Sequence, residues 1–273
     1  MSDHKHDENI NDVLGQVAYQ IKDTMDTMYA ALQRIAPADA RDADSELDEN
    51  AAMLTRNFYR LRRLSGNLEE AANLDAPMIE PQQNDDIIGL CAAITERARH
   101  SAQLLGLTLA FKSERSSYII ALNADRIERL LLNLLSNAFK FTPAGGTVTV
   151  EVRITARQVE LCVSDTGRGI APEQMEHLFD RYRRMNLPDG TPRGMGLGLP
   201  ICRKIAADHG GTLVVLSTEG EGTTVIASLE NKKTIMITMN TWIVGDYSGG
   251  FNRTLLELSD ALPRQAFRNQ MLD

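Results

Sequence analysis

The sequence lacks the features of several protein classes. No apolar run reaches the ~20 residues that a membrane-spanning helix requires, and the first residues are too polar for a signal peptide. The three cysteines lie far apart in the chain, which argues against a disulfide framework and favours buried, reduced thiols. The net charge of -8 argues against binding to nucleic acid or to an anionic membrane surface. We therefore expect a cytoplasmic protein with neither nucleic acid nor membrane as a partner.

The first part of the chain follows a helical pattern. Apolar side chains recur every three or four positions over residues 10–35, which predicts one long amphipathic helix after a polar tail over residues 1–9. Proline and aspartate break the pattern over 36–45, and a heptad seam then runs over 47–72. Two such helices joined by a short loop predict an antiparallel hairpin over residues 10–76.

A hairpin of this length cannot bury all of its apolar stripe within one chain. We therefore expect a homodimer through residues 10–76, in which two hairpins form a four-helix bundle. Val17 belongs to the predicted seam. Tyr19 lies about 200° further around the helix, so we expect its side chain to face solvent.

A later helix, predicted over residues 125–146, carries two distinct faces. Six apolar side chains on one face should pack on a sheet: Ile127, Leu130, Leu131, Leu134, Leu135 and Ala138. A polar stripe on another face aligns Asn133, Asn137 and Lys140. Amide oxygens suit Mg²⁺ and an ammonium suits phosphate, so the stripe can hold a metal ion and a polyphosphate. The alternative is an ordinary solvated face.

Two glycine-rich segments follow this helix. Asp165 ends a predicted strand, and Gly167 and Gly169 after it allow the backbone to approach a ligand closely. Three further glycines precede an apolar helix, whose N-terminus can bind phosphate: Gly194, Gly196 and Gly198. The P-loop pattern GxxxxGK[ST] is absent, as is a GxGxxG after a strand, which excludes both common nucleotide fingerprints.

In their order, these motifs resemble the GHKL ATPase superfamily, and specifically the ATP-binding domain of bacterial sensor histidine kinases. The matching segments are the N box NLLSNAFKFT, the first glycine box SDTGRGI, the F box LFDRYRR, the second glycine box RGMGLGL and a third, GEGTTV. The resemblance covers residues 80–230. It implies an α+β fold, with the helical hairpin followed by a two-layer α/β sandwich: a mixed sheet covered on one face by helices, with a mobile lid over ATP.

The resemblance also implies roles for individual residues. Asn137, supported by Asn133, would coordinate Mg²⁺ that bridges the phosphates, and Lys140 would contact phosphate. Asp165 would accept a hydrogen bond from the adenine amino group. The other expected contacts lie beside the base or around the triphosphate: Phe141, Gly167, Gly169, Gly194, Gly196, Gly198 and Thr223.

Two further features of the family concern catalysis. A lid would run over residues 181–192, where Arg181, Arg183 and Arg184 would either touch the γ-phosphate or form a solvated basic patch. Asn133 occupies the place where ATP-hydrolysing relatives such as gyrase carry a glutamate base. Because no carboxylate there activates water, phosphoryl transfer is favoured over hydrolysis.

The family's phosphoacceptor segment falls on the first helix, at YQIKDT (residues 19–24). Tyr19 stands in the place of the acceptor histidine, and Gln20 in the place of its acidic neighbour. An amide cannot take up a proton, and a tyrosine with a pKa near ~10 is a poor nucleophile. No histidine lies between His6 and His100, so no shift of register restores the site. The acceptor segment is degenerate, and self-phosphorylation on histidine by the usual mechanism is not expected.

Three functions fit these features. In the first, the chain binds ATP and Mg²⁺ and transfers the γ-phosphate to a partner in a two-component-type pathway. In the second, it is a degenerate kinase in which ATP gates the conformation and the hairpin recruits a partner kinase or a response regulator. The third is a serine kinase similar to the anti-sigma factors of the same superfamily, against which the long hairpin argues.

Residues 231–273 lie outside the resemblance. Strand-like segments over 234–238 and 241–244, a turn at 248–250 and a short amphipathic helix that ends at Pro263 are predicted there. This extension could extend the sheet, cover the hairpin or dock a partner. A cover over an edge strand is the expected role.

Overall fold

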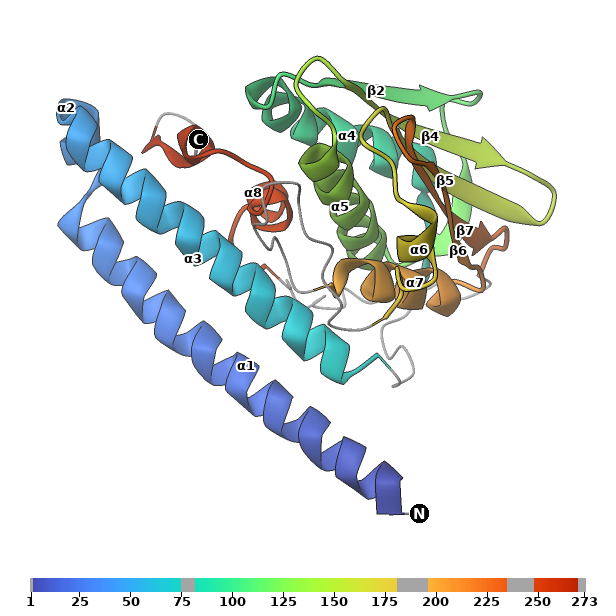
Figure 1. Cartoon of the computed structure of the whole chain (residues 1–273), viewed down its shortest axis with the longest axis horizontal. Helices are drawn as coiled ribbons and strands as arrows, with labels where there is room; N and C mark the ends of the chain where they lie inside the picture. Colours follow the sequence, from blue (N-terminus) through green and yellow to red (C-terminus); the bar gives the residue numbers. More distant parts are fainter. Residues whose placement is uncertain (1, 75–81, 181–195, 235–247, 270–273) are drawn as a thin grey trace. The chain divides into compact units, whose positions relative to one another are not determined.

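The computed structural model describes residues 2–74, 82–180, 196–234 and 248–269. The chain divides into two compact units (Figure 1). Met1–Ala76 and Leu262–Asp273 form the first, which we call the hairpin unit, and Pro77–Ala261 form the second, which we call the sheet unit. Both ends of the chain thus belong to the hairpin unit, and the extension after residue 230 is shared between the two units.

The hairpin unit is built on two antiparallel helices, as the sequence predicts, but the first helix already includes residues 2–9, which the sequence analysis places in a polar tail. They are α1 (Ser2–Ile35) and α3 (Ser45–Ala72), and the loop between them contains the short helix α2 (Ala38–Ala43) (Figure 1). Asp44 caps α3, because its carboxylate accepts hydrogen bonds from the backbone N–H groups of Glu46 and Leu47.

The face of α1 that packs on α3 differs from the predicted seam. Val17 is 42% exposed, whereas the adjacent Ala18 is fully buried. The backbone carbonyl of Ala18 accepts a hydrogen bond of 2.6 Å from the Ser65 hydroxyl. The placement of Val17 in the seam within the hairpin is wrong, because α1 carries two apolar stripes and the one that is buried contains Ala18 and Met25 instead. Tyr19 is 69% exposed, as predicted.

The second apolar stripe lies on the surface of the hairpin. It comprises the large exposed apolar side chains Val17, Ile21, Met28 and Ile35 on α1 and Met53, Leu54 and Leu61 on α3. The sequence correctly predicts that part of the stripe is uncovered within one chain. The dimer that would cover it stays a prediction.

The end of the chain completes the core of the hairpin unit. The 3₁₀ helix η1 (Arg264–Phe267) contains the fully buried Phe267, whose ring centroid lies 5.5 Å from that of Tyr59. Arg41 donates a 3.0 Å hydrogen bond to the carbonyl of Phe267 and a 2.9 Å bond to Asp48. Asp48 also accepts from the backbone N–H of Asn269 at 3.1 Å. Residues 262–269 therefore pack on α2 and α3 as part of the core of the hairpin unit.

The sheet unit contains a five-stranded mixed sheet in the order β2–β4–β5–β7–β6. Strands β2 and β4 are parallel, and the other neighbours are antiparallel. The strands are β2 (Thr108–Ser113), β4 (Thr147–Ile154), β5 (Gln158–Asp165), β6 (Leu213–Thr218) and β7 (Gly222–Glu230). A separate antiparallel pair is formed by β1 (Gln83–Asp86) and β3 (Ile119–Leu122).

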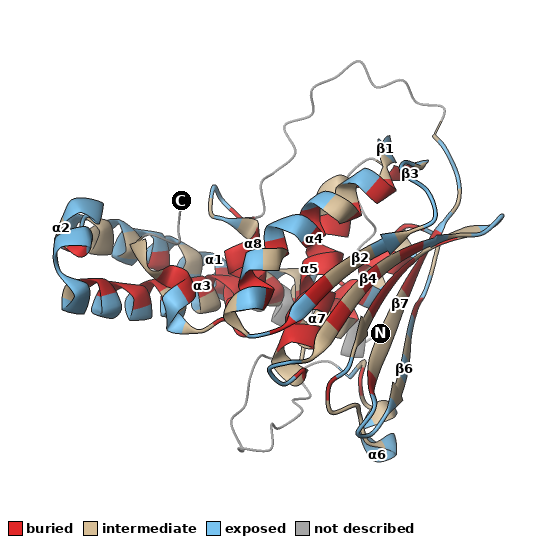
Figure 2. Ribbon diagram, turned by 90° about the horizontal axis from the view of Figure 1, so that it is seen from above, coloured by how far each residue is buried: buried red, intermediate tan, exposed pale blue. Residues whose placement is uncertain are grey.

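Three helices cover one face of this sheet (Figure 2). They are α4 (Ile87–Leu104), α5 (Ala124–Phe141) and α7 (Gly198–Asp208), and the short α6 (Pro172–Met175) follows β5. The six apolar residues of α5 that were predicted to face the sheet are all buried. The predicted two-layer fold, a mixed sheet with helices on one face, is confirmed.

The described part of the extension does not cover a sheet edge after Thr234. Before that point the extension runs beside β3, because the carbonyl of Lys232 accepts a 2.8 Å hydrogen bond from the N–H of Ala121. The strand-like segments fall almost entirely within 235–247, outside the described residues. The turn at 248–250 is confirmed, and the next helix, α8 (Arg253–Leu258), packs on α5 and ends earlier than predicted. For residues 248–269 the expected edge-strand cover is wrong, because their apolar side chains are buried against helices.

Two further predictions can be compared with the structure. The three cysteines Cys91, Cys162 and Cys202 are buried free thiols, as predicted. Over the described residues, no helix combines the length and the apolar character needed to cross a bilayer.

Candidate functional site

Helix α5 positions the predicted amide side chains. Its N-terminus is fixed by Asn123, whose side chain accepts a 3.1 Å hydrogen bond from the N–H of Arg126. Asn133 is 1% exposed, and its Nδ2 donates to the carbonyl of Arg129 at 3.0 Å. Its Oδ1 is directed toward the first turn of α7, where a Cβ added to Gly198 would lie 3.2 Å from it. Gly198 therefore lets α7 approach the amide closely.

The C-terminal end of α5 meets the loop that follows β5. The N–H of Arg168 donates a 3.2 Å hydrogen bond to the carbonyl of Phe141, and its guanidinium lies 4.9 Å from the centroid of the Phe141 ring. A Cβ on Gly167 would lie 2.4 Å from the same carbonyl oxygen. The close approach requires glycine at position 167 and brings Phe141 next to the Asp165–Gly169 loop.

The carboxyl group of Asp165 lies at the start of this loop. Its carboxylate accepts a 2.8 Å hydrogen bond from the N–H of Gly167 and another from the N–H of Thr223 on β7, its partner in the strand register. Desolvation raises the pKa of the Asp165 carboxyl, and the two backbone hydrogen bonds only partly oppose this shift. The Thr223 hydroxyl in turn lies 2.9 Å from that of Ser217 on β6. Strand pairing thus brings Asp165 and Thr223 together.

Two glycines fix the backbone near Asp165 and at the start of α7. Gly169 has a φ of 66°, and a Cβ there would lie only 1.9 Å from the carbonyl oxygen of Thr218. Gly196 has a φ of 71° and precedes Leu197, the N-cap of α7. Gly194 lies outside the described residues, as do the predicted lid over 181–192 and its arginines Arg181, Arg183 and Arg184.

Comparison with known proteins supports the resemblance that these residues suggest. Residues 122–233 match the family described as histidine kinase-, DNA gyrase B-, and HSP90-like ATPase. Over 230 residues the chain is 28% identical to the sensor protein SrrB of Staphylococcus aureus. The aligned region covers 84% of this chain and 39% of SrrB. The chain carries a histidine kinase transmitter core. It spans well under half the length of the curated relatives it matches.

Solved structures show the same fold. Full-length ShkA in complex with AMPPNP is 24% identical, with a TM-score of 0.66, over 82% of this chain and 46% of that one. ThkA in complex with the response regulator protein TrrA is 20% identical, with a TM-score of 0.55, over 81% of this chain and 61% of that one.

Lys140, the third member of the polar stripe of this kinase-type core, is engaged by a residue that the sequence analysis missed. Its side chain is 6% exposed, and Nζ lies 3.3 Å from Oδ2 of Asp260. The stripe as a whole is not the solvated face of the alternative prediction: Asn133 is buried and the Lys140 side chain nearly so, whereas Asn137 is partly exposed. The predicted contact between Lys140 and phosphate stays a prediction, and it has Asp260 as a competitor.

Asp260 belongs to a set of charged residues that joins α8 to α5. The carboxylate of Glu128 accepts a 2.6 Å hydrogen bond from Arg253, which also pairs with Asp125. Burial alone would lower the pKa of the Arg253 guanidinium, but the two carboxylates outweigh it and raise this pKa. Arg129 lies 3.8 Å from Glu257. One signal for this contact was present in the sequence, since RTLLELSDALP has an apolar face that needs a surface to cover it.

The degenerate acceptor segment belongs to the hairpin unit. Tyr19 and Gln20 are both exposed on α1. The hydroxyl of Thr24, which stands where the family has proline, donates a 2.9 Å hydrogen bond to the carbonyl of Gln20. The helix continues through this point to Ile35 without the kink that proline would impose.

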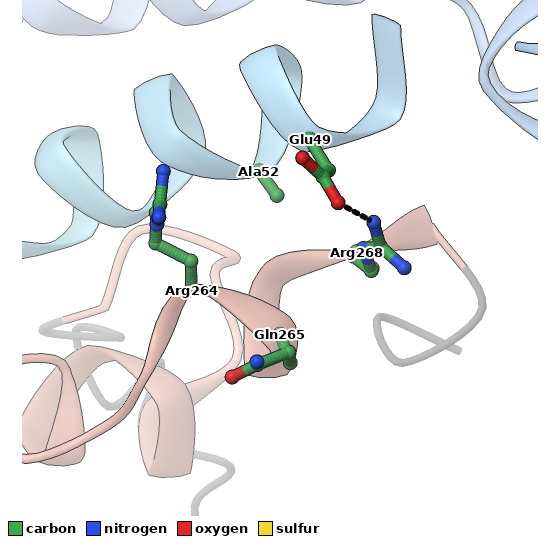
Figure 3. Close-up of a pocket in the computed structure, with 5 residues that line it drawn as sticks. All are labelled: Glu49, Ala52, Arg264, Gln265 and Arg268. Carbon is green, nitrogen blue, oxygen red and sulfur yellow. Dashed lines mark hydrogen bonds and ion pairs between the residues drawn. The ribbon is translucent and has the colours of Figure 1, made fainter. Parts of the chain in front are cut away.

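The hairpin unit also contains a small cavity of about 140 Å³ between α3 and the η1 segment (Figure 3). Its wall is formed by Glu49, Ala52, Arg264, Gln265 and Arg268. Arg268 donates a 2.6 Å hydrogen bond to Glu49 across it. None of the residues expected to bind ATP lines this cavity.

Proposed function

We propose that the chain is a histidine-kinase-like signalling protein that binds ATP with Mg²⁺ and transfers the γ-phosphoryl group to a protein partner in a two-component-type pathway. The observation that carries this proposal is the desolvated carboxylate of Asp165, held at a strand end beside Phe141 and Thr223. The ATPase-type family match and the AMPPNP complex of ShkA support it.

Adenine recognition would follow from the chemistry of the groups around Asp165. An ionised carboxylate accepts hydrogen bonds and donates none, so Asp165 suits the exocyclic amino group of adenine, which is a donor. Phe141 supplies an apolar ring surface for the base. Gly167 and Gly169 let the loop after Asp165 pack directly on the backbone of Phe141 and Thr218, where a Cβ would overlap with their carbonyl oxygens, and this packing holds Asp165 in place.

The amides of α5 suit the phosphate end of the nucleotide. Asn137, with Asn133 beside it, would hold Mg²⁺ through amide oxygen, the ligand type that this hard cation prefers. The bound ion would neutralise the negative charge of the phosphates. Lys140 would provide a cation for a phosphate oxygen once it leaves Asp260.

Transfer requires that the bond between the β,γ-bridging oxygen and the γ-phosphorus breaks, that a new bond to the acceptor forms, and that ADP leaves. Asn133 cannot take up the proton of an attacking water, so its amide favours transfer over hydrolysis. Tyr19 and Gln20 do not supply the usual histidine and its base. We therefore assign the acceptor role to a separate protein, and the response regulator bound to ThkA indicates the class.

The exposed apolar stripe of the hairpin supports a homodimer. Val17, Ile21 and Met28 on α1 would be buried if two hairpins formed a four-helix bundle, and burial of such side chains is favourable. In this arrangement the hairpin presents the partner-binding surface.

A second function is favoured by the degenerate acceptor segment. Without a nucleophile and a base at Tyr19 and Gln20, the chain would act as an ATP-gated binding module that recruits a kinase or a response regulator. This module would bind ATP without transferring phosphate.

Labelling with γ-³²P-ATP separates the two functions. We expect the full chain to bind ATP with Mg²⁺ and to transfer label to an added response regulator, and we expect Asn137→Ala to lose both binding and label. Asn57→Ala, the same exchange at an exposed position of α3, is the matched control. Acid-stable label that disappears in Tyr19→Phe would identify a tyrosine acceptor. Binding without label would establish the module, and absence of ATP binding would contradict both functions.

A further inference from the structure

The segment Arg253–Asp260 covers the nucleotide helix α5 on the side away from the sheet (Figure 1). Its apolar side chains Leu255, Leu256 and Leu258 are buried. On α5, the apolar sheet-facing residues and the polar residues Arg129, Ser136 and Lys140 lie on opposite sides of the helix. Arg129 and Ser136 are nevertheless buried, and the side chain of Lys140 is only 6% exposed. Helix α5 is thus enclosed between the sheet and the C-terminal segment.

The charges of the two surfaces are complementary. The positive Arg253 pairs with the negative Asp125 and Glu128 near the start of α5. The negative Glu257 faces Arg129. These pairs, together with the buried leucines, give the segment a defined register on α5 rather than a loose contact.

The last pair in this register involves the nucleotide site itself. Asp260 is 7% and Lys140 6% exposed in their side chains, and the ammonium lies 3.3 Å from the carboxylate. Lys140 is one helical turn from Asn137 on the same stripe of α5. The Asp260 carboxylate therefore pairs with the Lys140 ammonium, which in the proposed function binds a phosphate oxygen.

We propose that the segment Arg253–Asp260 is an autoinhibitory latch whose Asp260 holds Lys140 in place of a nucleotide phosphate. This inference rests on the proposed ATP binding at α5. When Lys140 turns to phosphate, Asp260 loses its counter-ion while still buried, which is unfavourable, so the segment is released from α5. Nucleotide binding and latch docking therefore oppose each other, and the coupling acts equally in both directions.

The affinity for ATP with Mg²⁺, measured by isothermal titration calorimetry on the full chain, tests the latch. Asp260→Asn removes the competing charge, and we expect it to tighten ATP binding by about five- to tenfold, within the usual range of coupling between two sites. Arg253→Gln weakens the latch at its other end without touching Lys140, and we expect it to tighten ATP binding as well. Asp39→Asn, at an exposed position of α2, should leave the affinity unchanged.

Hydrogen exchange of the unaltered chain gives an independent readout. We expect peptides that cover 253–260 to exchange faster when ATP with Mg²⁺ is added, while peptides from β5 become slower. Unchanged or weaker ATP binding in both latch variants, or unchanged exchange at 253–260 under saturating ATP, overturns the latch and leaves the proposed function intact. If the unaltered chain binds no ATP, the proposed function fails and the latch fails with it.

Discussion

The tight approach of the loop after β5 to the turn between β6 and β7 gives the most discriminating prediction. Gly169 and Gly220 both adopt left-handed backbone conformations, with φ of 66° and 84°, and they lie next to each other in space because the N–H of Gly220 bonds to the carbonyl of Arg168 at 2.7 Å. A Cβ on Gly220 meets no atom within 4 Å, whereas one on Gly169 would lie 1.9 Å from the oxygen and 2.7 Å from the carbon of the Thr218 carbonyl. The two exchanges to alanine therefore separate backbone strain from steric overlap.

The magnitudes follow from these surroundings. Gly220→Ala should cost about 1–2 kcal/mol, because an L-residue is strained in the left-handed region. Gly169→Ala adds overlap with backbone atoms that cannot rotate away, which costs a further ~1–3 kcal/mol. We expect Gly169→Ala to weaken ATP binding as well, since the Asp165–Gly169 loop must shift. Gly220→Ala should keep ATP binding.

The assay is peptide-resolved hydrogen exchange of β5 and β7, which reports the stability of the sheet unit without assuming that both units unfold together. The difference of ~1–3 kcal/mol corresponds to a protection lower by about five- to 160-fold in Gly169→Ala than in Gly220→Ala. Equal losses of protection in the two variants would show that the loop does not approach Thr218 as described.

Three further predictions concern buried groups. Phe267→Ala should destabilise the hairpin unit by about 3–5 kcal/mol, because it removes a fully buried ring, and exchange in α3 peptides would report this, with Phe267→Leu as a milder control. Burial lowers the pKa of His209, whose Nε2 accepts a 3.1 Å hydrogen bond from the N–H of Asn123. The stability that neutral His209 contributes is complete above pH 6.5, the ordinary value of the unfolded chain, and is lost as the pH falls below it, so urea titrations from pH 8 to 5 should show a decline that His209→Gln reduces. Desolvation raises the pKa of Asp165, so its charge destabilises the fold above that pKa. Asp165→Asn should therefore raise the urea midpoint at pH 8 but not below pH 3.8, and it should abolish ATP binding. An unchanged midpoint at pH 8 would contradict the raised pKa.

The sequence predicts the ATPase fold well because its signals are local. The apolar face of α5 follows from helical periodicity, and Asp165 with Gly167 and Gly169 follows from a strand that ends in a glycine-rich turn. The structure adds why these glycines are needed, through their close approaches to Phe141 and Thr218.

The features that sequence reasoning missed depend on tertiary contacts. The pairing of Lys140 with Asp260 joins residues 120 positions apart, and the apolar face of RTLLELSDALP does not by itself show that α5 is the surface it covers. Likewise, a heptad pattern does not show whether Val17 or Ala18 faces α3, because either stripe can pack within the hairpin. Phe267 gave no signal, since a single aromatic near the end of a chain is compatible with many environments.

The choice between ATP and GTP tests the central claim most directly. Asp165 should accept a hydrogen bond from the amino group of adenine, whereas guanine places a carbonyl oxygen at the corresponding position and two acceptors would oppose each other. In calorimetric titrations of the full chain with Mg²⁺, we expect saturable binding of ATP and binding of GTP that is weaker by at least about tenfold, the equivalent of one charged hydrogen bond. Equal affinity for the two nucleotides, or no binding of ATP, would contradict it.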